Sequence, residues 1–108
     1  MQDKNDIYWF STLGSGVMKY DPDKKPFQWY THNPNDPQSI SDNSVFELTA
    51  SKYHPNLIYV GTRNKGLNIL NQQTQTFKYV PYKVVEDTYG GAVRDIEESK
   101  DGTLWLGT

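Results

Sequence analysis

The segment Gly61-Thr62-Arg63-Asn64-Lys65-Gly66 comes closest to a chemical motif in this sequence. Its glycines and its lysine suggest a loop that cradles phosphate with backbone N–H groups. Such a loop ends in Gly-Lys followed by Ser or Thr, and it opens a helix. Here that ending is missing, and residues 67–70 form an apolar run typical of a strand. We therefore interpret the segment as a tight turn between two strands.

Other residues that could do acid–base or metal chemistry are not suitably grouped. His32 and His54 each lie beside a Pro-containing loop, without the matched acidic neighbours of a metal site or a general base. Glu97 and Glu98 are adjacent, so on a strand they point to opposite faces. The chain has no Cys, which excludes a thiol nucleophile, a disulfide and a Cys-ligated metal. We predict no catalytic residue, no metal site and no cofactor.

Composition excludes further classes of partner. The 108 residues have the size of one small domain and carry a formal net charge of -2. This charge gives no electrostatic footprint for nucleic acid or for an anionic membrane. No apolar run approaches the ~20 residues that span a bilayer, and the first residues lack the pattern of a signal peptide. We predict no nucleic-acid partner and no membrane segment in this chain.

A short pattern occurs three times and predicts the architecture. With Thr12, Thr62 and Thr108 in register, an aromatic residue stands three positions earlier in each copy. The interval of about 50 residues, with several short strands in each unit, is typical of propeller blades. A helical repeat would need apolar residues at helical spacing, which these Gly- and Pro-broken segments lack. The residues that we assign to the structural repeat are Trp9, Thr12, Gly16, Tyr59, Gly61, Thr62, Gly66, Asp101, Gly102, Trp105, Gly107 and Thr108.

The predicted fold is all-β, a propeller fragment of about two four-stranded blades with antiparallel strands. The Asp101-Gly102 pair predicts a hairpin turn. Three parts are expected: a partial blade with its connection at 1–43, a complete blade with its connection at 44–91, and the first two strands of a further blade at 92–108. The expected strands are 7–12, 17–20, 27–31, 44–49, 58–62, 67–70, 77–80, 92–97 and 103–108.

The propeller hypothesis also predicts one face for ligand contact. The long connections 32–43 and 81–91 cross between blades, on the same face as the link between the second and third strands of a blade. Segment 63–65 is such a link. Tyr89 lies at the end of the connection 81–91, and Arg94 begins an inner strand near the axis. From these placements we predict four ligand contacts, although solvated or packing roles are the plainer alternative: Arg63, Asn64, Tyr89 and Arg94. Trp29 and Tyr79 occupy matched outer positions, and we assign them to packing.

Two blades do not close a propeller, because closure takes ~4 to 8 blades. Open sheet edges are also a liability in solution. We therefore expect the chain to be a piece of a longer protein or to assemble with copies of itself. Its expected partners are the remaining blades of a parent chain or a second copy.

Several stretches resemble the two-component regulator propeller repeat. Residues 101–108, DGTLWLGT, fit that repeat closely, with the strand 92–97 ahead of them. Residues 58–62 with Gly66-Leu67 fit well, and residues 7–12 fit with Ser11 in place of Gly. The stretch 38–45 resembles the lead-in to an inner strand.

This resemblance implies a function. Such repeats are typical of the sensor regions of hybrid two-component systems in glycan-degrading gut bacteria. It implies a periplasmic, non-catalytic propeller that responds to oligosaccharides and signals to a histidine kinase. Two alternatives stay open: a propeller lyase or hydrolase with groups from several blades at the axis, and a scaffold that binds only proteins.

Overall fold

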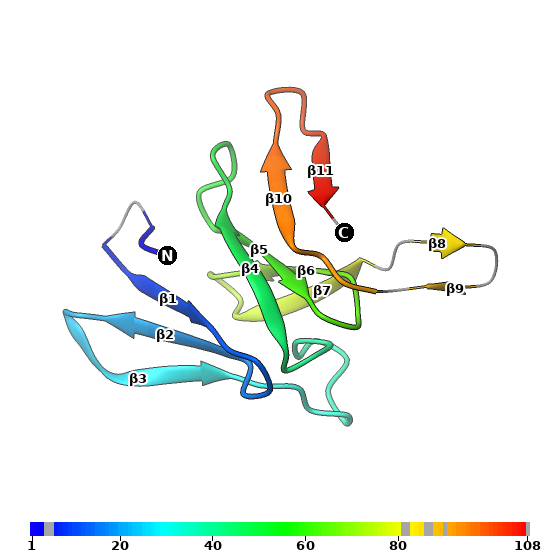
Figure 1. Cartoon of the computed structure of the whole chain (residues 1–108). Helices are drawn as coiled ribbons and strands as arrows, with labels where there is room; N and C mark the ends of the chain where they lie inside the picture. The colour runs from blue at the N-terminus through cyan, green and yellow to red at the C-terminus, as the bar shows by residue number, and fades with distance from the viewer. Residues whose placement is uncertain (4–5, 81–82, 86–87, 90, 108) are drawn as a thin grey trace.

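A computed structural model describes residues 1–3, 6–80, 83–85, 88–89 and 91–107. All its regular secondary structure in these residues is strand, and every pair of strands is antiparallel. Figure 1 shows three sheets side by side along the chain, with a small hairpin projecting from one end. The strands are β1 (Tyr8–Ser11), β2 (Val17–Asp21), β3 (Lys24–Tyr30), β4 (Val45–Ala50), β5 (Leu57–Thr62), β6 (Leu67–Asn71), β7 (Thr76–Val80), β8 (Lys83–Val85), β9 (Thr88–Tyr89), β10 (Asp95–Glu98) and β11 (Leu104–Gly107).

The sheets follow chain order, as in successive blades. They have the orders β1-β2-β3, β4-β5-β6-β7 and β10-β11. In the central sheet a register shift between Val45 and Glu47 leaves Phe46 at a bulge near the start of β4. The turn from β5 to β6 ends at Gly66, whose φ of 68° is accessible at low cost only to glycine. The observed sheets confirm the predicted all-β propeller fragment.

Two apolar layers hold the three sheets together. The first lies between β1–β3 and the central sheet, where the rings of Trp9 and Tyr30 stack with centroids 6.1 Å apart. Phe77 meets Tyr30 edge-on at 5.6 Å, and Ile40 from the connection fills the same layer. The second layer lies between the central sheet and β10–β11, and its buried members are Tyr59, Leu67, Val93 and Ile96.

In the first two copies of the repeat, the aromatic residue points toward the following sheet. Trp9 is buried in the first layer and Tyr59 in the second. The residue after the aromatic points to the opposite face of the strand, so Val60 packs in the first layer, against the preceding sheet. Trp105 and Phe10 lie on outward-facing surfaces and are 65% and 43% exposed. The alternation of side chains along a strand therefore determines which sheet each residue contacts.

The first three residues pair with β1 in a way that our strand assignment did not anticipate. The backbones of Met1 and Trp9 exchange hydrogen bonds of 2.7 and 2.9 Å. The bond from Asp3 N to the carbonyl of Ile7 matches the bond from Ser99 N to the carbonyl of Thr103. Residues 1–3 therefore occupy the inner-strand side of β1, as β10 does beside β11.

The strand expected at 27–31 begins earlier, at Lys24, because the pairing of Asp21 with Lys24 carries the β2–β3 ladder to the turn. Further differences from the expected strands lie near the connection 81–91. We expected only a crossing segment there, and the structure has the β8–β9 hairpin. The inner strand expected to begin at Ala92 begins at Asp95. The reason is that Val93 N donates to the carbonyl of Thr62 in the neighbouring sheet, so this residue joins two sheets before the β10–β11 ladder starts.

Candidate ligand-binding site

The repeated threonine closes the tight link after the second strand of each blade. The Thr62 hydroxyl donates to the Gly66 carbonyl at 2.8 Å and accepts from Lys65 N at 3.0 Å. Thr12 makes the same pair of bonds to the Gly16 carbonyl and from Ser15 N, at 2.7 and 3.1 Å. This role explains why the motif ends in Thr. The third copy, Thr108, lies outside the described residues.

The small residue before the threonine lets two sheets approach. A Cβ added at Gly61 would lie 2.6 Å from the carbonyl oxygen of Val93. Val93 lies just before β10, and its N–H donates to the Thr62 carbonyl. The contact at Gly61 is therefore between two backbones. Only a residue without a side chain fits there.

The links contact the ends of the long connections, where the described residues include Asp42, Asn43 and Gly91. Gly16 N donates to the Asn43 carbonyl at 2.7 Å, and Gly66 N donates to the Gly91 carbonyl at 2.9 Å. Asn64 is bound from both sides, because its N–H donates to Asp42 Oδ2 at 2.9 Å and its carbonyl accepts from Gly91 N at 3.1 Å. We refer to this surface, formed by residues 12–16, 42–45, 62–66 and 91–94, as the loop face.

Three of the four predicted ligand contacts lie on the loop face. Arg63, Asn64 and Arg94 are exposed. The guanidinium carbon of Arg94 lies 4.5 Å from the ring centroid of Phe46, on the inner strand of the central sheet. Tyr89 belongs to β9, and its side chain lies outside the described part of the structure. Their role in binding stays a prediction.

Sequence reasoning missed a buried and well hydrogen-bonded charged group, Glu98. This buried carboxylate accepts hydrogen bonds from Tyr59 Oη at 2.7 Å, Ser51 Oγ at 2.7 Å and Lys52 N at 2.6 Å. Burial by itself would raise the pKa of Glu98. The hydrogen bonds from these three groups outweigh that effect, with a smaller contribution from His54, and the pKa falls below 4.5.

Glu98 joins β10 to the central sheet, because its three donors all belong to β4–β5 and the residues between them. Its position in the sequence alternation could have indicated this buried role. Glu98 follows Ile96 on the buried face of the strand, whereas Glu97 is exposed. A carboxylate at an apolar-facing position needs partners from a neighbouring element. With its oxygens occupied by donors, Glu98 has a structural role here.

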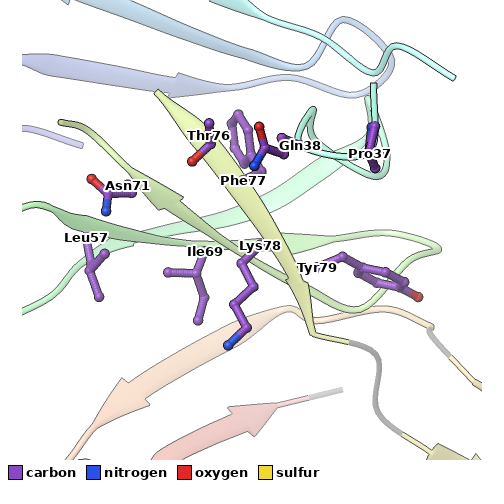
Figure 2. Close-up of a pocket in the computed structure, with 9 residues that line it drawn as sticks. All are labelled: Pro37, Gln38, Leu57, Ile69, Asn71, Thr76, Phe77, Lys78 and Tyr79. Atoms are coloured by element: carbon purple, nitrogen blue, oxygen red, sulfur yellow. The ribbon is translucent and has the colours of Figure 1, made fainter. Parts of the chain in front are cut away.

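Two open grooves lie at the outer strands. The larger, of about 660 Å³, runs along β7, and Figure 2 shows Leu57, Ile69 and Lys78 on one side of this strand with Phe77 and Gln38 on the other. The smaller, of about 270 Å³, is lined by Trp29, Asn33, Asp36, Gln38 and Gln75, among others. The smaller groove combines amide groups, a carboxylate and an exposed indole, which can contact a polar ligand. Tyr79, assigned to packing, is 39% exposed beside the larger groove.

Within the described residues, no three His, Cys, Asp or Glu side chains are grouped as a metal site requires. Both histidines are exposed, and a ring nitrogen of His32 lies 2.7 Å from the Ile40 carbonyl oxygen. The same residues include no helix with the length and apolar character of a membrane span.

Comparisons with known proteins agree with this architecture. The family model described as "Two component regulator propeller" matches residues 90–108. A search of the curated proteins finds no match. Among solved structures, 11 chains match. One is the extracellular domain of BT3049 from B. thetaiotaomicron, a protein assigned as a hybrid two-component system. The identity is 26% and the TM-score 0.84, over 98% of this chain and 14% of that chain.

Proposed function

We propose that this propeller segment of the two-component regulator type is part of a periplasmic sensor in a hybrid two-component system. In this proposal it helps to bind an oligosaccharide, and the signal reaches a histidine kinase in the same protein. The observation that carries the proposal is the structural likeness over 98% of the chain to an extracellular domain of such a system. The family match at residues 90–108 supports the same assignment.

The proposed mechanism is binding without catalysis. A ligand changes the signalling state only if it binds one conformation of the sensor better than the other. The loop face suits this role because backbone hydrogen bonds from adjacent sheets meet there, so a ligand can touch two sheets together. The Glu98 network then couples movement of the β10–β11 sheet to the central sheet.

The proposed partners in the assembly are further blades of a parent chain, with a second copy as the alternative. The outward-facing surface of β1–β3 supports this view, because Tyr8, Phe10 and Trp29 are 38%, 43% and 51% exposed. Trp105 is 65% exposed on the outward surface of β10–β11. Large aromatic residues gathered on a sheet face are typical of surfaces that another element covers.

The test is calorimetric titration of the complete protein with neutral and acidic oligosaccharides, followed by an assay of kinase autophosphorylation. We expect one class to bind saturably and to change the phosphorylation rate. Asn64→Ala on the loop face should weaken binding, whereas Lys100→Ala, in the turn at the far end of β10, should not. Chemical conversion of the sugar by the protein would favour the alternative of a propeller enzyme over the sensor proposal. Absence of any oligosaccharide response, with stoichiometric binding to a purified protein partner, would replace it with the scaffold.

A further inference from the structure

The sequence contains only two arginines, Arg63 and Arg94, against nine lysines, and the fold brings the arginines together. The residues that precede them are joined by the 2.8 Å hydrogen bond from Val93 N to the Thr62 carbonyl. Arg63 N also donates to the Ser44 carbonyl at 2.9 Å, two residues before Phe46. Both arginines therefore lie where the innermost strands β4 and β10 begin, and Figure 1 shows these strands side by side.

Phe46 holds one of the two guanidinium groups in place. The guanidinium carbon of Arg94 lies 4.5 Å from its ring centroid, within the range of a cation–π contact. Phe46 is in turn placed by the bulge between Val45 and Glu47. Stacking uses the flat face of a guanidinium and leaves its N–H groups, which lie in the plane, available. Arg94 is thus oriented before any ligand arrives.

The described acidic residues nearby form no ion pair with either arginine. In the described part of the chain, neither arginine side chain has an ion-pair partner. Asp42 accepts from Ser44 N and Asn64 N through its two oxygens. Glu47 accepts from Leu48 N, and Asp95 packs against Gly107. Two exposed guanidinium groups that have no carboxylate partner among the described residues leave a local positive charge on a chain whose net charge is -2.

We propose that Arg63 and Arg94 form a site for the anionic group of an acidic sugar, a carboxylate or a sulfate. This inference rests on the proposed oligosaccharide-sensing function and specifies its ligand class. Guanidinium groups match such oxyanions because two parallel N–H groups can reach two oxygens. Phe46 acts as a positioning residue, and Lys65 in the same link adds charge at the rim.

The test observes the two arginines directly. Because these 108 residues contain only two, the Nε–Hε signals of the 15N-labelled segment can be assigned with one variant each. Sodium glucuronate and sodium sulfate are titrated at constant ionic strength against sodium chloride, with glucose as the neutral probe. We expect both arginine signals to shift with one shared midpoint, and glucose to leave them unchanged. A larger response to glucuronate identifies the carboxylate as the preferred group, and the reverse result identifies sulfate.

Variants separate recognition of the anion from bulk charge. Arg94→Lys keeps the charge but loses the paired N–H groups, so we expect roughly tenfold weaker binding, the factor for one charge-assisted hydrogen bond. Phe46→Leu should weaken binding and shift the Arg94 signal in the free protein. Lys100→Gln, which removes a charge at the opposite end of β10, is the matched control and should change nothing.

Three results would overturn the site: equal shifts with chloride, separate midpoints for the two arginines, or full affinity in Arg94→Lys. Oligosaccharide binding that leaves both arginine signals unmoved would also refute it while the sensor function stands. Conversely, anion binding at the arginines without any kinase response to oligosaccharides would refute the sensor function and leave the site intact.

Discussion

Replacing Glu98 with Gln should destabilise the fold although the change is nearly isosteric. The carboxylate accepts three hydrogen bonds, with Oε1 receiving Lys52 N and Oε2 receiving the hydroxyls of Tyr59 and Ser51. A glutamine has one accepting oxygen. If that oxygen faces Lys52 N, the NH2 group faces two hydroxyls that must turn from donating to accepting. The Ser51 hydroxyl already accepts from His54 N at 2.9 Å and Tyr53 N at 3.3 Å.

At least one hydrogen bond to a charged group is therefore lost, and one buried polar group is left poorly paired. Each of these effects has a cost of about 1 to 3 kcal/mol. We expect Glu98→Gln to lower the free energy of unfolding by about 2 kcal/mol at pH 7. Glu97→Gln, on the exposed side of the same strand, should stay within about 0.5 kcal/mol of the parent chain.

The assay is urea unfolding followed by tryptophan fluorescence, with the free energy obtained by linear extrapolation. The pH dependence adds a second check. The folded-state pKa of Glu98 lies below its ordinary value of 4.5, so its charge stabilises the fold above that pH. The contribution is lost as the pH falls through the folded-state pKa. The gap between the parent chain and Glu98→Gln should therefore narrow below pH 4.5. An equal loss in Glu97→Gln, or a gap that stays constant at low pH, would refute the reasoning.

Two further predictions concern the turns of the repeat. Thr62→Val keeps the shape of the side chain but removes the hydroxyl that bonds the Gly66 carbonyl and Lys65 N. We expect the free energy of unfolding to fall by about 1 to 3 kcal/mol and amide exchange at Lys65 to become faster. Thr62→Ser, which keeps the hydroxyl, should restore both. Unchanged exchange at Lys65 would contradict the role given to the hydroxyl. For Asp101, a hydrogen bond from the Ser99 hydroxyl, together with the bond from Thr103 N, lowers the pKa to about 2. A carbon-detected NMR titration should give a carboxyl pKa near that value in the parent chain and a higher pKa in Ser99→Ala. A pKa at the usual value for Asp in the parent chain would show that the turn is open in solution.

Much of the fold could be predicted because each blade is stabilised by local patterns. Tyr and Val in alternation, with Gly and Asp at the turns, specify short strands without reference to distant residues. The register of Thr12 with Thr62 then predicts equivalent links, and their hydrogen bonds are indeed alike. The boundaries of the three predicted parts stay a prediction.

The sites were harder to predict because they depend on residues far apart in the chain. No local pattern marks Glu98 as a buried acceptor, since its donors Ser51 and Tyr59 lie in another sheet. Likewise, the propeller hypothesis placed Arg63 in a link on the binding face and Arg94 at the start of an inner strand near the axis, but the contact of Arg94 with Phe46 depends on a bulge in the neighbouring strand.

The sequence by itself determined the strands, their turns and the repeat, because alternation and turn chemistry act over a few neighbouring residues. Only the tertiary structure decided which aromatic residues are buried, how Glu98 is paired and how the two arginines meet. Identical motif positions have different surroundings: Trp9 is fully buried, whereas Trp105 is 65% exposed. The physical reason is that burial and pairing depend on which sheet lies opposite, and that contact is made between segments that are distant in the chain.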